Sequence, residues 1–172
     1  MSGARDARRR PNATVFITGA SSGLGEALAR HYAAKGAALG LFARREAELA
    51  RVSSGLRSPH VACYAGDVRD ASALAGAARD FIARHGVPSI VIANAGVSRG
   101  TLTEHREDLP AFRAVFDTNV MGIVHTFQPF VAAMRDRHGG ALVGVASIAG
   151  FRGVRGSGAY SASKAAAITY LE

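Results

Sequence analysis

The sequence predicts a single α/β domain built on an open, doubly wound parallel sheet. Short apolar runs alternate with segments whose apolar residues recur at helical spacing, and this alternation continues along the whole chain. The apolar runs lack the polar alternation of half-exposed strands, which indicates strands that are covered by helices on both faces. Five such strand–helix repeats without a linker favour one sheet domain over two.

Each expected strand is followed by a turn and then by a helix. The first helix carries an apolar stripe that begins at Leu24 and includes Leu28 and Tyr32. The longest helix keeps the α-helical period from Phe112 to Met134, and we expect a kink at its only proline, Pro129. The expected strands are 13–18, 37–43, 61–65, 89–93 and 141–146, and helices begin near residues 24, 46, 74, 112 and 160.

The composition is that of an ordinary globular protein. Of the 172 residues, 48% are hydrophobic and 20% are charged, which suits one domain with a sizeable core. No apolar stretch approaches the roughly 20 residues of a membrane-spanning helix, and Cys63, the single cysteine, cannot form an internal disulfide. The six histidines lack the spacing of metal ligands. We therefore expect a cytoplasmic protein that binds neither membrane nor metal.

The formal net charge of +8 requires that nucleic-acid binding be considered. Four arginines lie in residues 1–11, which we expect to form a basic, disordered tail ahead of the domain at 12–172. The remaining basic residues are spread along the chain, without a basic stripe that is interleaved with aromatic side chains. Nucleic acid is therefore not an expected partner.

A glycine-rich turn follows the first expected strand and opens the first expected helix. Glycines there would let the backbone turn sharply and approach a diphosphate, while the helix N-terminus directs free N–H groups at the phosphates. This position indicates a dinucleotide site in a Rossmann-type fold, with a turn that binds nothing as the alternative reading. The expected contact residues are Gly19, Ser21, Ser22, Gly23, Leu24 and Gly25.

The end of the second expected strand indicates which dinucleotide is bound. An acidic residue about 20 residues after the turn would pair with the ribose hydroxyls of NAD. The sequence has Ala43 there, followed by Arg44 and Arg45. Two guanidinium groups offer forked, charge-assisted hydrogen bonds to a 2′-phosphate. We therefore expect NADP(H) rather than NAD(H), although the arginines could also be ordinary residues of the next helix.

Tyr160 and Lys164 lie four residues apart in the last expected helix, so their side chains share one face. An ammonium group beside a phenol favours the phenolate. Ser147 follows the fifth strand, and Asn119 lies in the long helix before that strand. In identity, order and spacing, these four residues resemble the catalytic tetrad of the short-chain dehydrogenases/reductases.

Further motifs carry the same resemblance, which runs from about residue 12 to residue 172. The glycine spacing T-G-x-x-x-G-x-G and the segment Y-S-A-S-K at 160–164 are similar to family motifs. The N-A-G segment at 94–96 is also similar to a family motif, although Ala93 replaces a frequent asparagine. The acidic residue at position 67 resembles the family's acidic position that contacts the adenine. The resemblance adds as cofactor-binding residues Asp67, Val68, Asn94, Ala95 and Gly96, together with Tyr160 and Lys164.

The resemblance implies hydride transfer between a nicotinamide and a carbonyl or secondary alcohol. Tyr160 would give or take the proton, and Ser147 would hold the substrate oxygen. Lys164 would stabilise the phenolate and bind the nicotinamide ribose, while Asn119 would hold a water in the proton relay. The cofactor carries the hydride itself. The partner is a small carbonyl or alcohol compound, and relatives often form homodimers or homotetramers.

Family members usually run to about 250 residues, so we expect this chain to lack the last strands of the family fold. The fifth strand would then be an exposed apolar edge. Two alternatives stay open, an inactive dinucleotide-binding fragment and a nucleotide-sugar epimerase or dehydratase, which shares Tyr-x-x-x-Lys but resembles a different glycine spacing. The expected residues of the substrate wall are Ser98, Arg99, Ala149, Phe151, Arg152 and Val154.

Overall fold

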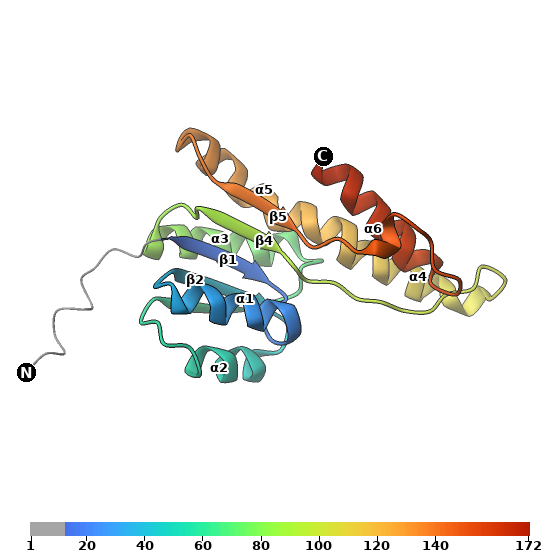
Figure 1. Ribbon diagram of the computed structural model, residues 1–172, viewed down its shortest axis with the longest axis horizontal. Coiled ribbons are helices and arrows are strands. Elements are labelled where there is room, and N and C mark those ends of the chain that lie inside the picture. The colour runs from blue at the N-terminus through green and yellow to red at the C-terminus, as the bar shows by residue number, and fades with distance from the viewer. Residues whose placement is uncertain (1–12) are drawn as a thin grey trace, which may run out of the picture.

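The computed structural model describes residues 13–172 and contains one five-stranded sheet (Figure 1). All neighbouring strands pair in parallel, in the order β3-β2-β1-β4-β5. The expected doubly wound α/β fold is therefore confirmed, whereas the expected tail at 1–11 lies outside the described residues. The strands are β1 (Thr14–Thr18), β2 (Ala38–Ala43), β3 (Val61–Ala65), β4 (Ile90–Ala93) and β5 (Ala141–Gly144).

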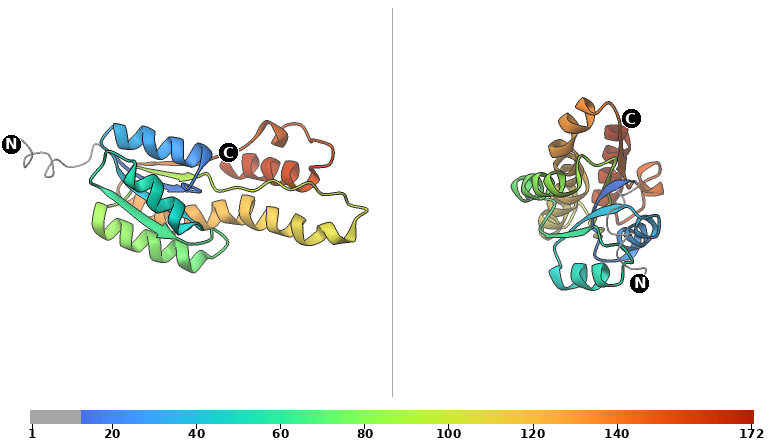
Figure 2. Two further views of the ribbon diagram at one scale, coloured as in Figure 1. Left: turned by 90° about the horizontal axis from the view of Figure 1, so that it is seen from below. Right: turned by 90° about the vertical axis from the view of Figure 1, so that its left-hand side faces the viewer.

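Helices cover both faces of the sheet (Figure 2). Helices α1 (Gly23–Ala34) and α2 (Glu46–Ser54) pack on one face, where Ile17, Leu41 and Leu49 join one apolar cluster. Helices α3 (Ala71–His85) and α5 (Gly122–Asp136) pack on the other face, where Phe16 and Phe130 join a second cluster. Neighbouring residues of β1 thus point into different clusters, which explains why the strand is apolar throughout.

Helix α1 packs against the core partly through the stripe that the sequence predicts, since Leu28 and Tyr32 contact the apolar cluster on this face of the sheet. Its buried residues are Gly25, Ala29 and Ala33, whereas Leu24 is 53% exposed. A Cβ atom at Gly25 would collide with the carbonyl oxygen of Gly19, so the helix approaches the sheet too closely for larger side chains. The prediction missed Gly25, Ala29 and Ala33, because hydrophobicity alone does not reveal that small residues are required for this close approach.

The long helix expected from Phe112 to Met134 is interrupted, although not at its proline. The chain runs from the short η2 (Arg106–Asp108) through α4 (Leu109–Phe116) and the π-helical η3 (Asp117–Met121) into α5. Pro129 lies inside α5, which continues past it to Asp136. The π-helical turn contains Asn119. Single π-helical turns inside α-helices occur frequently at functional sites.

The carboxyl ends of the strands face a projecting part of the molecule. There α4, which follows the loop after β4, and α6 (Gly158–Leu171), which follows β5 and η4 (Ile148–Gly150), extend beyond the sheet (Figures 1 and 2). Strand β5 forms the sheet edge with Leu142 and Val143 about two-fifths exposed, as expected. It ends at Gly144 and not at residue 146, because the carbonyl group of Val145 accepts a hydrogen bond from Lys164. In residues 13–172, no helix has the length and apolarity to cross a membrane.

Candidate active site

The glycine turn lies against the residues that follow β4. Gly19 has a φ of +68°, a conformation that favours glycine, and a Cβ atom there would lie 2.8 Å from the Cα atom of Ala95. The Asn94 amide donates to the carbonyl oxygens of Thr18 and Gly19 at 3.0 and 3.2 Å. Asn94 therefore fixes the turn across the switch point between β1 and β4, where open α/β sheets bind their ligands.

A pocket of about 290 Å³ opens at this switch point. It joins the glycine turn, the ends of β2 and β3, and the N-A-G segment, as the sequence predicts for a dinucleotide site. Val97 and Thr118, which the sequence analysis does not identify, also line it. The complete lining is Gly19, Ser21, Ser22, Ala43, Arg44, Arg45, Gly66, Asp67, Val68, Asn94, Ala95, Gly96, Val97 and Thr118.

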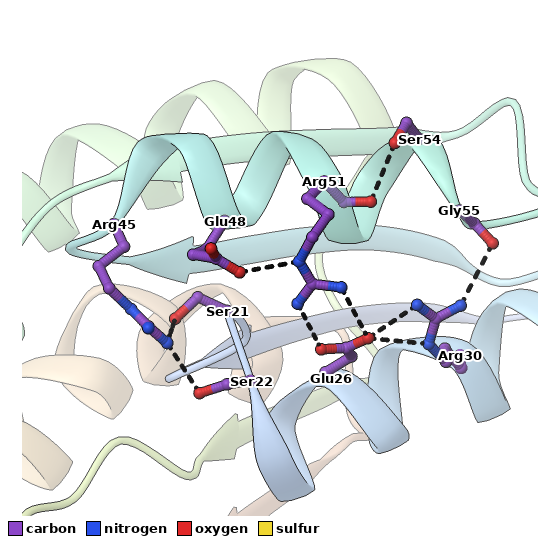
Figure 3. Close-up of polar contacts among 9 residues, drawn as sticks. All are labelled: Ser21, Ser22, Glu26, Arg30, Arg45, Glu48, Arg51, Ser54 and Gly55. Carbon is purple, nitrogen blue, oxygen red and sulfur yellow. Dashed lines mark hydrogen bonds and ion pairs between the residues drawn. The ribbon is translucent and has the colours of Figure 1, made fainter.

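The N-terminus of α1 and the start of α2 meet at the mouth of the pocket (Figure 3). Ser22 is the N-cap of α1, yet its side chain makes no capping hydrogen bond to the helix. Instead, the Arg45 guanidinium donates to the hydroxyl oxygens of Ser21 and Ser22 at 3.1 and 2.8 Å. The arrangement leaves the first N–H groups of α1 and one guanidinium group close to the same opening.

Arg44 points to the other side of the pocket. Its Nη1 atom lies 4.0 Å from the Asp67 carboxylate, which also accepts a 2.7 Å hydrogen bond from Arg69. The hydrogen bond from Arg69 and, to a smaller extent, the charge of Arg44 lower the pKa of Asp67. Of the two arginines after β2, Arg45 thus contacts the glycine turn and Arg44 contacts an acid.

A salt-bridge cluster joins α1 to α2 behind Arg45 (Figure 3). The Glu26 carboxylate accepts from Arg30 at 2.7 Å within α1 and from Arg51 at 2.8 Å across to α2. Glu48 binds the same Arg51 guanidinium at 2.8 Å. The two arginines lower the pKa of Glu26 to about 2, Arg51 having the larger effect.

Asn119 is fully buried, and its side chain binds partners that lie 22 and 44 residues away in the sequence. Its Oδ1 atom accepts from the Val97 amide at 2.8 Å, and its Nδ2 atom donates to the Val97 carbonyl at 2.9 Å and to the Ser163 hydroxyl at 3.0 Å. Ser163 in turn donates to the Tyr160 carbonyl at 2.7 Å. Asn119 therefore connects the segment after β4 to the helix that carries Tyr160.

Lys164 and Tyr160 lie together on α6, as their spacing predicts. The Lys164 Nζ atom lies 5.8 Å from the centroid of the Tyr160 ring and donates to the Val145 carbonyl at 2.6 Å. A Cβ atom at Gly96 would lie 3.7 Å from the same Nζ atom and 3.3 Å from Asn119 Oδ1. Burial lowers the pKa of Lys164. Lys164 and Asn119 thus meet at the edge of the dinucleotide pocket.

Ser147 is the N-cap of η4, which packs against α6. The half-buried Ser147 hydroxyl accepts a 3.2 Å hydrogen bond from the Ala149 amide. Ala149 is buried, whereas Phe151, another expected wall residue, is 80% exposed. The serine thus lies at the base of the loop that leads from β5 to Tyr160.

Thr18, at the start of the glycine turn, and two residues that were not predicted, Val97 and Ser163, also support the site. The Thr18 hydroxyl accepts a 3.2 Å hydrogen bond from the backbone N–H of Asn94, while Val97 and Ser163 bind the side chain of Asn119. Ser163 could have been identified, because it is the second serine of the Y-S-A-S-K segment. The role of Val97 could not, because it uses only backbone atoms. In residues 13–172, no cluster of His, Cys, Asp and Glu could hold a metal ion.

The strand order and the pocket at the switch point define a Rossmann-type α/β protein. A family model described as short chain dehydrogenase matches residues 13–172. The chain belongs to this family. It is 39% identical over 161 residues to a protein named uncharacterized oxidoreductase from Myxococcus xanthus, covering 92% of this chain and 63% of that relative.

Two solved structures are similar to the chain at 29% identity. An alcohol dehydrogenase from Thermococcus sibiricus, complexed with 5-hydroxy-NADP, has a TM-score of 0.83, with 92% of this chain and 68% of that one covered. A short chain dehydrogenase/reductase from Burkholderia phymatum, in complex with NAD, has a TM-score of 0.84, with 94% and 58% covered. The chain therefore spans less than two thirds of the length of the Myxococcus relative and of the Burkholderia structure.

Proposed function

We propose that the protein is an NADP(H)-dependent oxidoreductase that interconverts a carbonyl compound and a secondary or primary alcohol. The observation that carries the proposal is the buried Lys164 ammonium, which lies 5.8 Å from the Tyr160 ring at the edge of the pocket. Lys164 has no carboxylate partner within residues 13–172; burying an ammonium in this way is costly, and such groups concentrate at functional sites. The family match supports the same chemistry.

The residues of the pocket fit a dinucleotide. Gly19 and Gly25 allow the backbone contacts at the turn, and the uncapped N-terminus of α1 offers N–H groups to a diphosphate. Asp67 and Val68 line the part of the pocket that the adenine would occupy. The solved relatives are complexes with an NADP derivative in one case and NAD in the other. For this chain, Arg45 at the glycine turn and Ala43 at the end of β2 favour NADP(H).

In the direction of reduction, Tyr160 would give its hydroxyl proton to the carbonyl oxygen while Ser147 donates a hydrogen bond to that oxygen. When bound, the reduced nicotinamide supplies the hydride that reaches the carbonyl carbon, so the products are the alcohol and the oxidised cofactor. Lys164 would stabilise the phenolate that remains and would bind the ribose next to the nicotinamide. Asn119 would hold the groups around this proton path in place.

The experiment is to follow NADPH oxidation with a panel of aldehydes and ketones and to repeat it with Tyr160→Phe. We expect turnover in the parent protein and a loss of about 100-fold or more in kcat for the variant, with NADPH binding nearly unchanged. Retained turnover in the variant would remove Tyr160 from the mechanism. NADPH binding without turnover of any carbonyl or alcohol would favour a non-catalytic dinucleotide-binding role. The expectations of a homodimer or homotetramer and of a cytoplasmic location stay predictions.

A further inference from the structure

Three exposed arginines lie in the two loops that follow β4 and η4, and none of them has an acidic partner within residues 13–172. Arg99, Arg152 and Arg155 are all exposed, and none forms an ion pair or a side-chain hydrogen bond within residues 13–172. Other arginines, such as Arg51 and Arg69, bind carboxylates, whereas Arg57 is likewise exposed and has no such partner within residues 13–172. The three guanidinium groups therefore keep their hydrogen-bonding capacity for a ligand.

Backbone contacts bring two of these arginines together. The segments at 97–101 and 154–157 run side by side, because the Thr101 amide donates to the Gly156 carbonyl at 3.0 Å and Thr101 forms a parallel bridge with Ser157. Gly100 and Gly156 are in close contact across these two segments. Arg99 directly precedes Gly100, and Arg155 directly precedes Gly156. Two positive charges thus flank one short junction.

This junction is attached directly to the candidate active site. Two residues before Arg99, Val97 is held by the buried amide of Asn119. Two residues after Arg155, Ser157 is the N-cap of α6, three residues ahead of Tyr160. The Val154 amide also donates to the Ser161 hydroxyl at 3.1 Å, which ties the loop to the first turns of α6. The arginines are therefore placed by the same elements that place the proton donor.

The loop between Ser147 and α6 also presents apolar side chains. Ile148, Phe151 and Val154 are 84%, 80% and 53% exposed, and Arg152 lies between the last two. Within residues 13–172, the acidic residues after Thr101 form no ion pair with these arginines: Glu104 and Glu107 approach His105, and Asp108 accepts from the Leu102 amide. An apolar surface with unpaired guanidinium groups suits a ligand that has an apolar body and an anionic group.

We infer that Arg99, Arg155 and Arg152 bind an oxyanion of the substrate, so that the site selects apolar carbonyl compounds that carry a carboxylate or a phosphate. The inference rests on the proposed function and names its substrate class. The planar guanidinium groups form forked hydrogen bonds with either anion, and their charge also attracts it from solution. The adjacent Ile148 and Phe151 would contact the apolar body of the substrate.

The test uses three aldehydes that share one reactive group. 4-Formylbenzoate carries a carboxylate, 4-formylphenyl phosphate carries a phosphate, and methyl 4-formylbenzoate is the neutral match. With NADPH, we expect kcat/KM for at least one anion to exceed that for the ester by about tenfold or more, and the better anion identifies the group. Equal or higher kcat/KM for the ester would overturn the inference.

Variants then test whether the preference for anionic aldehydes depends on these arginines. Arg99→Gln and Arg155→Gln should each lower kcat/KM for the preferred anion about tenfold more than they lower kcat/KM for the ester. The matched control is Arg57→Gln, because Arg57 is an exposed arginine just before β3, at the end of the parallel sheet opposite to Ser147. An equal loss in the Arg57 variant, or no loss in the other two, would contradict the site.

A binding measurement separates this inference from the proposed reaction. The side-chain Nε–H signals of the arginines are followed by NMR while 4-formylbenzoate, 4-formylphenyl phosphate or the ester is added without cofactor. Shifts at Arg99 and Arg155 with an anion, but not with the ester, support the site even if no carbonyl is reduced. Absence of such shifts, or equal shifts at Arg57, overturns the site even if the protein proves to be a reductase.

Discussion

Lys164 donates a 2.6 Å hydrogen bond from Nζ to the carbonyl oxygen of Val145, and this contact joins α6 to the end of β5. The lysine is 5% exposed, and burial lowers its pKa from the ordinary 10.5. The unfolded chain therefore binds a proton at this position more readily than the folded chain does. Below the ordinary pKa the buried lysine reduces the free energy of unfolding, and this cost disappears as the pH rises towards 10.5.

The first prediction concerns Lys164→Met. From neutral pH to about pH 10, the free energy of unfolding of the parent protein should rise relative to that of the variant. The variant should also lose about 100-fold or more in kcat, because the proton donor loses its ammonium neighbour. Denaturant titrations at several pH values and steady-state kinetics give the two readouts. A constant difference in stability across this range would show that the lysine binds its proton equally in both states.

Arg45 is the residue on which NADP(H) preference should depend. A charge-assisted hydrogen bond contributes about 1.5–3 kcal/mol, so Arg45→Gln should weaken NADPH binding by about 10- to 100-fold. Binding of NADH should change little, because it lacks the 2′-phosphate. Titration of each cofactor into the two proteins measures the change.

The matched control for this prediction is Arg44→Gln. Arg44 lies 4.0 Å from Asp67 on the other side of the pocket, whereas Arg45 contacts Ser21 and Ser22. We therefore expect a smaller effect on NADPH binding from this change. A parent protein that binds NADH as tightly as NADPH would contradict the assignment of the cofactor, whatever the variants do.

Much of this fold and site could be predicted because local patterns determine them. The apolar strands, the glycine turn and the Tyr160–Lys164 spacing are each visible within a few residues of sequence. The small buried residues of α1 could not be predicted, because Gly25 is required by its contact with Gly19 and not by hydrophobicity. The π turn around Asn119 was also missed, because its partners lie 22 and 44 residues away.

Glu26 should make the stability depend on pH in acid. Arg51 and Arg30 lower its pKa from 4.5 to about 2, so the folded chain releases this proton more readily than the unfolded chain. The resulting stability is fully present above pH 4.5 and is lost as the pH falls towards 2. In Glu26→Gln, the melting temperature should therefore fall less over this window than in the parent protein.

The control for Glu26 is Glu48→Gln, which removes a contact of Arg51 within α2 but keeps the contact between α1 and α2. Its melting temperature should follow the acid dependence of the parent protein more closely. High salt should reduce the Glu26 effect, because the pair is partly exposed and is screened. The same acid dependence in Glu26→Gln and in the parent protein would show that the two arginines do not stabilise this carboxylate in solution.

Asn119 should contribute more to stability than a typical polar residue does. Its side chain satisfies both the N–H and the C=O group of Val97 and binds the Ser163 hydroxyl from a fully buried position. Asn119→Leu keeps a similar size but leaves these groups without their partner, and each unsatisfied buried group costs about 1–3 kcal/mol. We expect the free energy of unfolding to fall by about 2–4 kcal/mol in denaturant titrations.

Thr126→Val tests whether this cost comes from the long-range contacts of Asn119. Thr126 is equally buried, but its hydroxyl bonds only to the Gly122 carbonyl one turn earlier in α5. The change should cost about 1 kcal/mol, since a single local hydrogen bond is lost. Because Asn119 joins the segment after β4 to α6, its variant should also expose Val97 to amide exchange, whereas the threonine variant should not. Equal losses of stability with unchanged exchange at Val97 would mean that Asn119 acts as an ordinary buried polar group.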